Sequence, residues 1–293
     1  MPTLKIKRWS HSMMGDNCVV AILGKRNTGK SVLVRDLVKK KLCDSDFAYG
    51  VACSGTEAVQ PVYSETMLPP ELVHEEYTSE LMSGILEVQK KRVQAAKAQD
   101  SIRERYRGDA RMLAANPPLP SKCWVILDDV LHQSNVFLTD KALKFAIYNG
   151  RHLHMTLAIV FQVPNPPGWG PNYRTQVDLV FIFREMSHTG RRKIWEYYAS
   201  VVPTFDLFNR IMDHVTANYG ILVVNNRTQS TRMEDCVFWY RADPSIQPCD
   251  VRHDASWRMC REMIYEDPGT GTEPDIGMEV VKNKRLHVDI EFE

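Results

Sequence analysis

Residues 24–31 read Gly24-Lys25-Arg26-Asn27-Thr28-Gly29-Lys30-Ser31, and this stretch decides the expected fold. It matches the phosphate-binding pattern G-x-x-x-x-G-K-[ST], in which the glycines let consecutive backbone N–H groups point at phosphate oxygens. An apolar run at 18–23 precedes the loop, and apolar residues with helical spacing follow it from Val32 to Leu42. A buried strand, a glycine loop and a helix in that order favour a nucleotide site over a chance match.

The residue types in the loop indicate which groups bind a nucleotide. The amine of Lys30 is expected to reach the β- and γ-phosphates, and the hydroxyl of Ser31 is expected to bind Mg²⁺. The sequence therefore predicts ATP and Mg²⁺ as ligands. The residues expected to contact the nucleotide are Gly24, Lys25, Arg26, Asn27, Thr28, Gly29, Lys30 and Ser31.

The composition is that of a globular protein with a substantial core. Of 293 residues, 44% are hydrophobic and 25% are charged. The net charge of +1 neither requires nor excludes a nucleic-acid partner, so any basic surface must be local. The amino-terminal residues contain no apolar signal region, and no apolar run approaches the ~18 residues of a membrane span. We therefore expect neither secretion nor a membrane span. The seven cysteines form no C-x-x-C pair, which favours reduced thiols inside a cell.

Strand and helix patterns alternate along the chain. This alternation predicts right-handed crossovers and an α/β fold with a mainly parallel central sheet flanked by helices. Ligands of such sheets bind at the carboxyl ends of the strands, where Gly24, Ser54, Asp128 and Gln162 all fall. We expect one shared site there. The expected strands are 18–23, 47–53, 124–127, 156–161, 179–183, 220–225 and 235–240, and the expected helices follow the loop and cover 77–107, 138–149, 189–200 and 204–214.

The composition of the sequence changes near residue 243. Residues 243–293 contain 12 acidic and 6 basic side chains, a net charge of −6, and include the linker-like run DPGTGT at 267–272. We expect an ATPase domain over 1–242 and an acidic carboxyl-terminal arm or partly disordered tail over 243–293.

Two adjacent carboxylates follow the apolar run 124–127. An aspartate at the end of a buried strand beside a phosphate loop can hold Mg²⁺, and we assign that role to Asp128. A second carboxylate can polarise the water that attacks the γ-phosphate, and we assign that role to Asp129. An acidic turn at a strand end is the alternative. Many ATPases with such a pair carry Glu at the second position, and Asp is shorter by one methylene.

Two further residues are candidates for the chemistry. Gln162 ends the strand at 156–161, where its amide can contact both the γ-phosphate and the attacking water; a hydrogen bond to a loop is an equal alternative. Arg151 lies just before that strand and can act as an arginine finger in a neighbouring subunit. A surface arginine is the alternative, and Arg174 and Arg184 are competitors for the same role.

Local basic clusters provide candidate contacts with a phosphate backbone. Residues 90–111 contain eight Lys or Arg against three Asp or Glu, a local net of +5. Contacts with DNA made by such a stripe depend strongly on salt. A solvated helix face is the default explanation. Further clusters lie at 39–41 and 191–193.

Taken together, these motifs resemble the DNA-packaging ATPases of large double-stranded DNA viruses, the poxvirus-type branch of the FtsK–HerA superfamily. The stretches that carry the resemblance are 23–31, Ser54-Gly55-Thr56-Glu57, 125–129, and 150–152 with Phe161-Gln162. They span about residues 15–240. Ser54-Gly55 differs from the Ser-Pro expected in that branch, and the residues after 243 lie outside the resemblance.

The resemblance implies a RecA-like P-loop ATPase that assembles as a homo-oligomeric ring and moves double-stranded DNA without sequence specificity into a viral capsid. It also implies capsid or portal partners, and a location in the host cytoplasm at the virus assembly site or in the virion. Two alternatives stay open: a P-loop kinase, and an ATP-gated DNA-binding or scaffold protein without motor activity. A GTPase is disfavoured because no strand-end Asn-Lys-x-Asp signature occurs.

Overall fold

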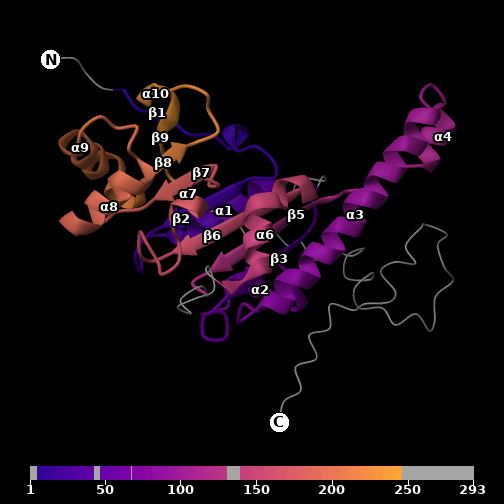
Figure 1. Cartoon of the computed structure of the whole chain (residues 1–293), viewed down its shortest axis with the longest axis horizontal. Coiled ribbons are helices and arrows are strands. Elements are labelled where there is room, and N and C mark those ends of the chain that lie inside the picture. The colour runs from indigo at the N-terminus through magenta and orange to yellow at the C-terminus, as the bar shows by residue number, and fades with distance from the viewer. Residues whose placement is uncertain (1–4, 43–46, 67, 131–138, 246–293) are drawn as a thin grey trace, which may run out of the picture.

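The described part of the protein is built on one nine-stranded sheet (Figure 1). The computed structural model describes residues 5–42, 47–66, 68–130 and 139–245. The strand order is β1-β9-β8-β7-β2-β6-β5-β3-β4. The strands are β1 (Lys7–Arg8), β2 (Val19–Leu23), β3 (Phe47–Ser54), β4 (Val73–His74), β5 (Lys122–Asp128), β6 (Met155–Phe161), β7 (Leu179–Ile182), β8 (Ile221–Asn225) and β9 (Val237–Tyr240).

Helices cover both faces of this sheet. α3 packs against α6 on one face, and right-handed crossovers place α1 on the other. The helices are α1 (Lys30–Leu42), α2 (Tyr63–Thr66), α3 (Ser79–Arg105), α4 (Ala110–Ala115), α6 (Lys141–Asn149), α7 (Pro171–Arg174), α8 (His188–Tyr198), α9 (Phe205–Val215) and α10 (Met233–Cys236). Short 3₁₀ turns are η1 (His11–Met13), η2 (Pro70–Leu72), η3 (Gly150–Leu153) and η4 (Ala217–Tyr219).

The expected α/β fold class is confirmed. Six neighbouring strands, from β7 to β4, pair in parallel. Every residue of β2 and β3 is buried, as expected of strands covered on both faces. The sheet departs from the parallel pattern at one end, because β8 runs antiparallel to both β7 and β9.

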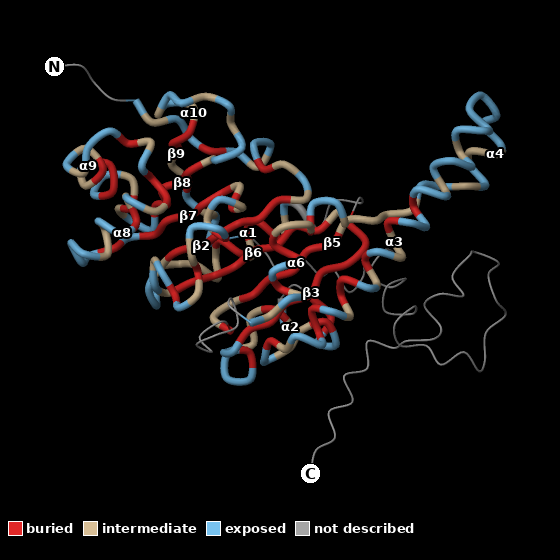
Figure 2. Tube along the Cα trace, viewed as in Figure 1, coloured by how far each residue is buried: buried red, intermediate tan, exposed pale blue. Residues whose placement is uncertain are grey.

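Helix α3 leaves the body of the protein (Figure 1). The first two thirds of the helix bury seven residues, of which Ala96 is the last, and the final third beyond Ala96 buries none. This final third pairs with α4, where the guanidinium of Arg103 donates to the carbonyl oxygens of Leu113 and Asn116. Figure 2 shows this hairpin as mostly exposed and intermediate residues. We call residues 97–116 the distal arm.

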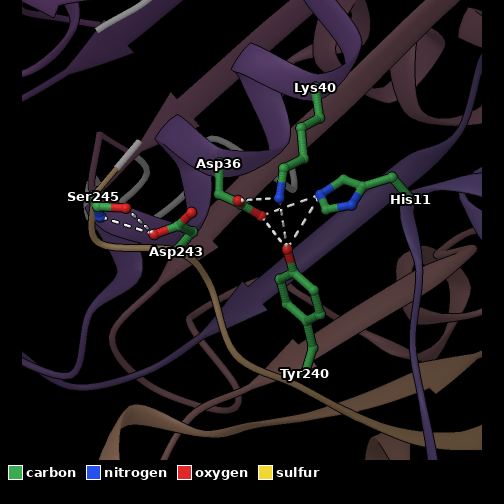
Figure 3. A network of polar contacts seen from close by, with 6 residues as sticks. All are labelled: His11, Asp36, Lys40, Tyr240, Asp243 and Ser245. Atoms are coloured by element: carbon green, nitrogen blue, oxygen red, sulfur yellow. Dashed lines mark hydrogen bonds and ion pairs between the residues drawn. The ribbon is translucent and has the colours of Figure 1, made fainter. Parts of the chain in front are cut away.

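A polar cluster fixes α1 against η1 and β9 (Figure 3). The buried carboxylate of Asp36 accepts hydrogen bonds from His11 Nε2 at 3.1 Å, from Lys40 Nζ at 2.7 Å, and from the hydroxyl of Tyr240. Burial alone would raise the pKa of Asp36, but these three partners hold it below its ordinary value. The helix that follows the phosphate loop is therefore anchored to β9 by a charged group.

The predicted domain boundary near 242 stays a prediction. Residues 246–293, which form most of the expected acidic arm, lie outside the described residues.

Candidate functional site: a phosphate loop facing two aspartates

The loop between β2 and α1 has the backbone of a phosphate-binding loop. A Cβ on Gly24 would lie 2.7 Å from Thr28 Oγ1 and 2.9 Å from Phe183 Cβ, so no side chain fits there. Gly29 has φ +99°, a left-handed conformation that favours glycine. Helix α1 begins at Lys30 and adds its free N–H groups to the loop. These features match an anion site of the expected kind.

The two lysines of the loop point to different groups. Lys30 Nζ donates to the carbonyl oxygen of Lys25 at 2.9 Å, which places the amine over the loop. Lys25 Nζ forms an ion pair with Glu185 Oε1 at 2.6 Å, and Glu185 is buried in the segment that follows β7. Lys30 is thus directed to the phosphate position, whereas Lys25 ties the loop to the neighbouring strand.

The sheet brings the loop and the two aspartates to the same edge. β6 lies between β2 and β5, with Leu23 opposite Phe161 and Asp128 opposite Val160. The carboxyl ends of β2 and β5 are therefore about 10 Å apart. Burial lowers the pKa of Lys30, and the negative charges of Asp128 and Asp129 act against that shift. Lys30 and both carboxylates therefore interact at one site.

Asp128 is held by a buried tyrosine that the sequence did not indicate. The hydroxyl of Tyr63, whose side chain is 0% exposed, donates to Asp128 Oδ2 at 2.7 Å. Burial raises the pKa of Asp128, and both the hydrogen bond from Tyr63 and the charge of Lys30 oppose this rise. Tyr63 therefore favours the ionised carboxylate that a metal ligand must be.

Tyr63 is itself positioned by Glu57. The carboxylate of Glu57 accepts from the backbone N–H groups of Val62, Tyr63 and Ser64 at 2.8 to 3.3 Å, at the start of α2. Glu57 follows the end of β3, which pairs with β5 at Ser54 and Asp128. Glu57 ends the stretch 54–57, which carries part of the family resemblance, but no spacing in the sequence predicts its contact with Tyr63.

Asp129 and Gln162 are in direct contact. The amide nitrogen of Gln162 donates to Asp129 Oδ2, so the end of β6 is linked to the residue after β5. Asp129 has φ +58°, a left-handed conformation that non-glycine residues rarely adopt outside functional sites and turns. Gln162 thus contacts the loop residue that directly follows β5, and its contact with the γ-phosphate stays a prediction.

The three candidate arginines lie in different places. Arg151 is in η3, before β6, and the seven residues of β6 separate it by about 23 Å from the edge that carries Gln162. Arg174 lies over the Tyr197 ring at 4.1 Å and donates to Asn165. Arg184 is exposed and follows β7 at the same edge as the phosphate loop. The structure therefore does not bring Arg151 to the site of its own chain.

The basic clusters are partly engaged in contacts within the chain. Lys90 lies 5.1 Å from the ring of Phe145, and Arg92 lies 5.2 Å from the ring of Tyr49. Arg191 pairs with Asp213 at 2.7 Å, and Lys40 pairs with Asp36. The two ion pairs reduce the net positive charge of the clusters at 39–41 and 191–193, whereas the ring contacts orient Lys90 and Arg92 and leave their charges unchanged.

The donor set fits a magnesium ion. Mg²⁺ prefers hard oxygen ligands and usually takes one or two carboxylates, water and phosphate oxygens. Ser31 at the start of α1 supplies a hydroxyl, and Asp128 supplies a carboxylate whose ionisation Tyr63 favours. The residues present therefore match the chemistry of the ion.

Comparisons with known proteins place the chain in a viral family. No protein-family model matches it. The uncharacterised protein 088R of Invertebrate iridescent virus 3 is 32% identical over 234 residues, which are 79% of this chain and 78% of that protein. This chain belongs to the family of 088R.

Solved structures of two ATPases are similar to this chain, and one of them exceeds a TM-score of 0.5. EssC (ATPases 2 and 3) from Geobacillus thermodenitrificans aligns with 89% of this chain and 52% of its own, at 12% identity and a TM-score of 0.51. The DNA-packaging ATPase B204 from Sulfolobus Turreted Icosahedral Virus aligns with 78% of this chain and 100% of its own, at 14% identity and a TM-score of 0.48. The likeness to EssC confirms the expected α/β fold with a mainly parallel central sheet. Within the described ranges, no helix is both long and apolar enough to span a membrane.

Proposed function

We propose that this protein is an ATPase that couples ATP hydrolysis to the packaging of double-stranded viral DNA. The hydrolytic part is supported by the register of the sheet, which brings the phosphate loop after β2 and the aspartates at the end of β5 to one edge, two strand positions apart. The phosphate loop and the two carboxylates face each other there, as a triphosphate bound with a divalent cation requires.

Different residues of the site would bind the phosphates, hold the metal ion and activate the attacking water. The backbone of residues 24–29 and the amine of Lys30 would bind the phosphates. Ser31 and Asp128 would hold Mg²⁺, which neutralises charge on the β- and γ-phosphates when bound. Asp129 would accept a hydrogen bond from the attacking water and polarise it.

Gln162 gives Asp129 a function that depends on the nucleotide. Its amide has one carbonyl oxygen and one NH₂ group, and the NH₂ group donates to Asp129. The second hydrogen of the NH₂ group can donate to a γ-phosphate, so Gln162 would contact both Asp129 and the γ-phosphate in the triphosphate state and Asp129 alone in the diphosphate state. Asp129 is one methylene shorter than a glutamate, and the contact with Gln162 together with its left-handed backbone fixes where its carboxylate lies.

The packaging part is supported by the virus family and by the motifs. Protein 088R is a viral protein, and the stretches at 23–31, 125–129 and 150–162 resemble those of packaging ATPases. We propose a homo-oligomeric ring on DNA at the capsid, at the virus assembly site in the host cytoplasm. Arg151 is exposed and distant from its own site, so its proposed role is confined to a neighbouring subunit.

The loop after Gln162 disfavours a kinase. A kinase lid usually carries arginines above an open acceptor site, whereas this loop is packed. Trp169 is buried and stacks on Tyr173 with rings 5.5 Å apart, and its Nε1 donates to the hydroxyl of Tyr198.

The test is an ATPase assay with and without double-stranded DNA across a salt series. We expect phosphate release that DNA stimulates, with a stimulation that decreases steeply as salt rises. A phosphorylated acceptor without DNA dependence would indicate a kinase. ATP binding without turnover would indicate a scaffold. If DNA changes neither the rate nor the oligomer size, the packaging proposal is wrong and only the NTPase remains.

A further inference from the structure

An exposed tyrosine lies beside the phosphate loop. Tyr219, in η4 between α9 and β8, is 68% exposed. Its Cδ1 atom lies 3.6 Å from the position that a Cβ on Gly29 would take, and Phe183 Cε1 lies 3.5 Å from the same position. Two aromatic rings therefore lie beside the loop residue that directly precedes Lys30, and that of Tyr219 is open to solvent.

The backbone that presents this ring is strained. Tyr219 has φ +59° and Asn218 has φ +49°, so two consecutive residues adopt the left-handed conformation. Asparagine tolerates this region, but a bulky aromatic residue rarely occupies it. Such strain persists only where the surroundings impose it, and it clusters at ligand-binding sites.

The surroundings do impose it. A Cβ on Gly220 would lie 1.9 Å from the carbonyl oxygen of Val215, so the chain passes too closely for any residue but glycine. The N–H of Gly220 donates to Ala217 at 2.9 Å, and the buried hydroxyl of Thr216 donates to Met212 at 2.6 Å. The backbone of the turn is therefore fixed before and after Tyr219, which holds its Cα beside the phosphate loop.

The position of Tyr219 fits the nucleoside end of a bound nucleotide. Asp128 lies on the β6–β5 side of the phosphate loop, whereas β7 and β8 lie on the other side of β2. Leu222 of β8 pairs with Ile182 of β7, so the start of β8 lies at the same edge as the loop. A triphosphate whose γ end faces Asp128 directs its nucleoside away from Asp128, towards Tyr219.

We propose that Tyr219 is the stacking platform for the base of the bound nucleotide. This inference rests on the proposed ATPase function and adds a residue that binds the base. A tyrosine ring stacks on any base, so the contact supplies affinity without selecting adenine over guanine. Phe183 supports Gly29 from within the core and does not compete for the base, because it is buried.

The test compares the binding of Mg-ATP with that of magnesium tripolyphosphate, which has the phosphates without the nucleoside. In Tyr219→Asn, the ATP dissociation constant should rise by about tenfold, since one stacked base corresponds to about 5- to 150-fold in affinity. Tripolyphosphate should bind as in the unchanged protein. Tyr219→Trp should retain ATP affinity. The melting temperature of Tyr219→Asn should rise by about 1–3 °C, because asparagine adopts the left-handed conformation more readily.

Tyr106→Asn is the matched control, since Tyr106 is a second exposed tyrosine that lies on the distal arm. It should change neither affinity. Unchanged ATP affinity in Tyr219→Asn would overturn the inference and leave the ATPase proposal intact. An equal loss of ATP and tripolyphosphate binding would mark Tyr219 as a residue that shapes the loop, and would also overturn it. If the unchanged protein binds neither ligand, the proposed function fails, and this inference fails with it.

Discussion

Tyr63→Phe tests whether the buried tyrosine positions Asp128 for magnesium. The substitution removes one hydroxyl from a fully buried ring and leaves the shape of the side chain nearly unchanged. Asp128 then loses the donor that lies 2.7 Å from Oδ2. Burial raises the pKa of Asp128, and without the hydroxyl of Tyr63 one of the groups that counteract this rise is lost. The carboxylate also becomes free to rotate.

The expected increase in the magnesium requirement follows from the negative charge of the acceptor, Asp128. A hydrogen bond to a charged group contributes about 1.5–3 kcal/mol, which corresponds to about ten- to hundredfold in an equilibrium constant. Loss of a partner that orients a metal ligand typically costs about 10–100-fold in metal affinity or activity. We therefore expect the free Mg²⁺ concentration that half-saturates ATP hydrolysis to rise by about tenfold or more.

Tyr77→Phe is the matched control. Tyr77 is also a buried tyrosine, and its hydroxyl donates to Asp140 at 2.5 Å at the start of α6, outside the nucleotide site. It should lower stability without changing the magnesium dependence. The reasoning is refuted if both variants shift the magnesium dependence equally, or if Tyr63→Phe leaves it unchanged while ATP is hydrolysed.

Three other variants have defined outcomes. Tyr240→Phe should lower the free energy of unfolding by about 1.5–3 kcal/mol at neutral pH, because Asp36 loses a donor. The pKa of Asp36 is lowered by folding, so this stabilisation is complete above its ordinary value of 3.8 and is lost as pH falls through the folded value; urea unfolding at several pH values measures it. Lys30→Ala should abolish the binding of both ATP and tripolyphosphate in calorimetry, and retained tripolyphosphate binding would contradict the assigned role. Gly24→Ala should weaken both ligands by at least about tenfold, because its Cβ meets Phe183 at 2.9 Å and the loop must shift.

The centre of the fold was predictable because its signals are local. The strand before the loop, the glycines and the helix from Lys30 occupy consecutive residues, and the structure has them as β2, the loop and α1. The rule that parallel strands end at one edge then placed Gly24, Asp128 and Gln162 together. The same rule explains Arg151, because a residue that precedes a parallel strand lies at the opposite edge.

The remaining features depend on tertiary contacts. Tyr63 reaches Asp128 from a four-residue helix, and no periodic pattern marks a helix of that length. Tyr219 is placed by a left-handed turn whose strain is invisible in the sequence around it. The reversal at β8 was also not signalled: α8 and α9 fill the connection from β7, just as helices fill a parallel crossover.

The most direct measurement is phosphate release by Asp129→Asn with ATP binding recorded in the same sample. Asparagine preserves the size of the side chain and removes the charge that polarises water. ATP affinity should stay within a few-fold of the unchanged protein while release falls by about 10²- to 10⁴-fold. Release at an undiminished rate would contradict the claim that the phosphate loop and the two aspartates form one hydrolytic site.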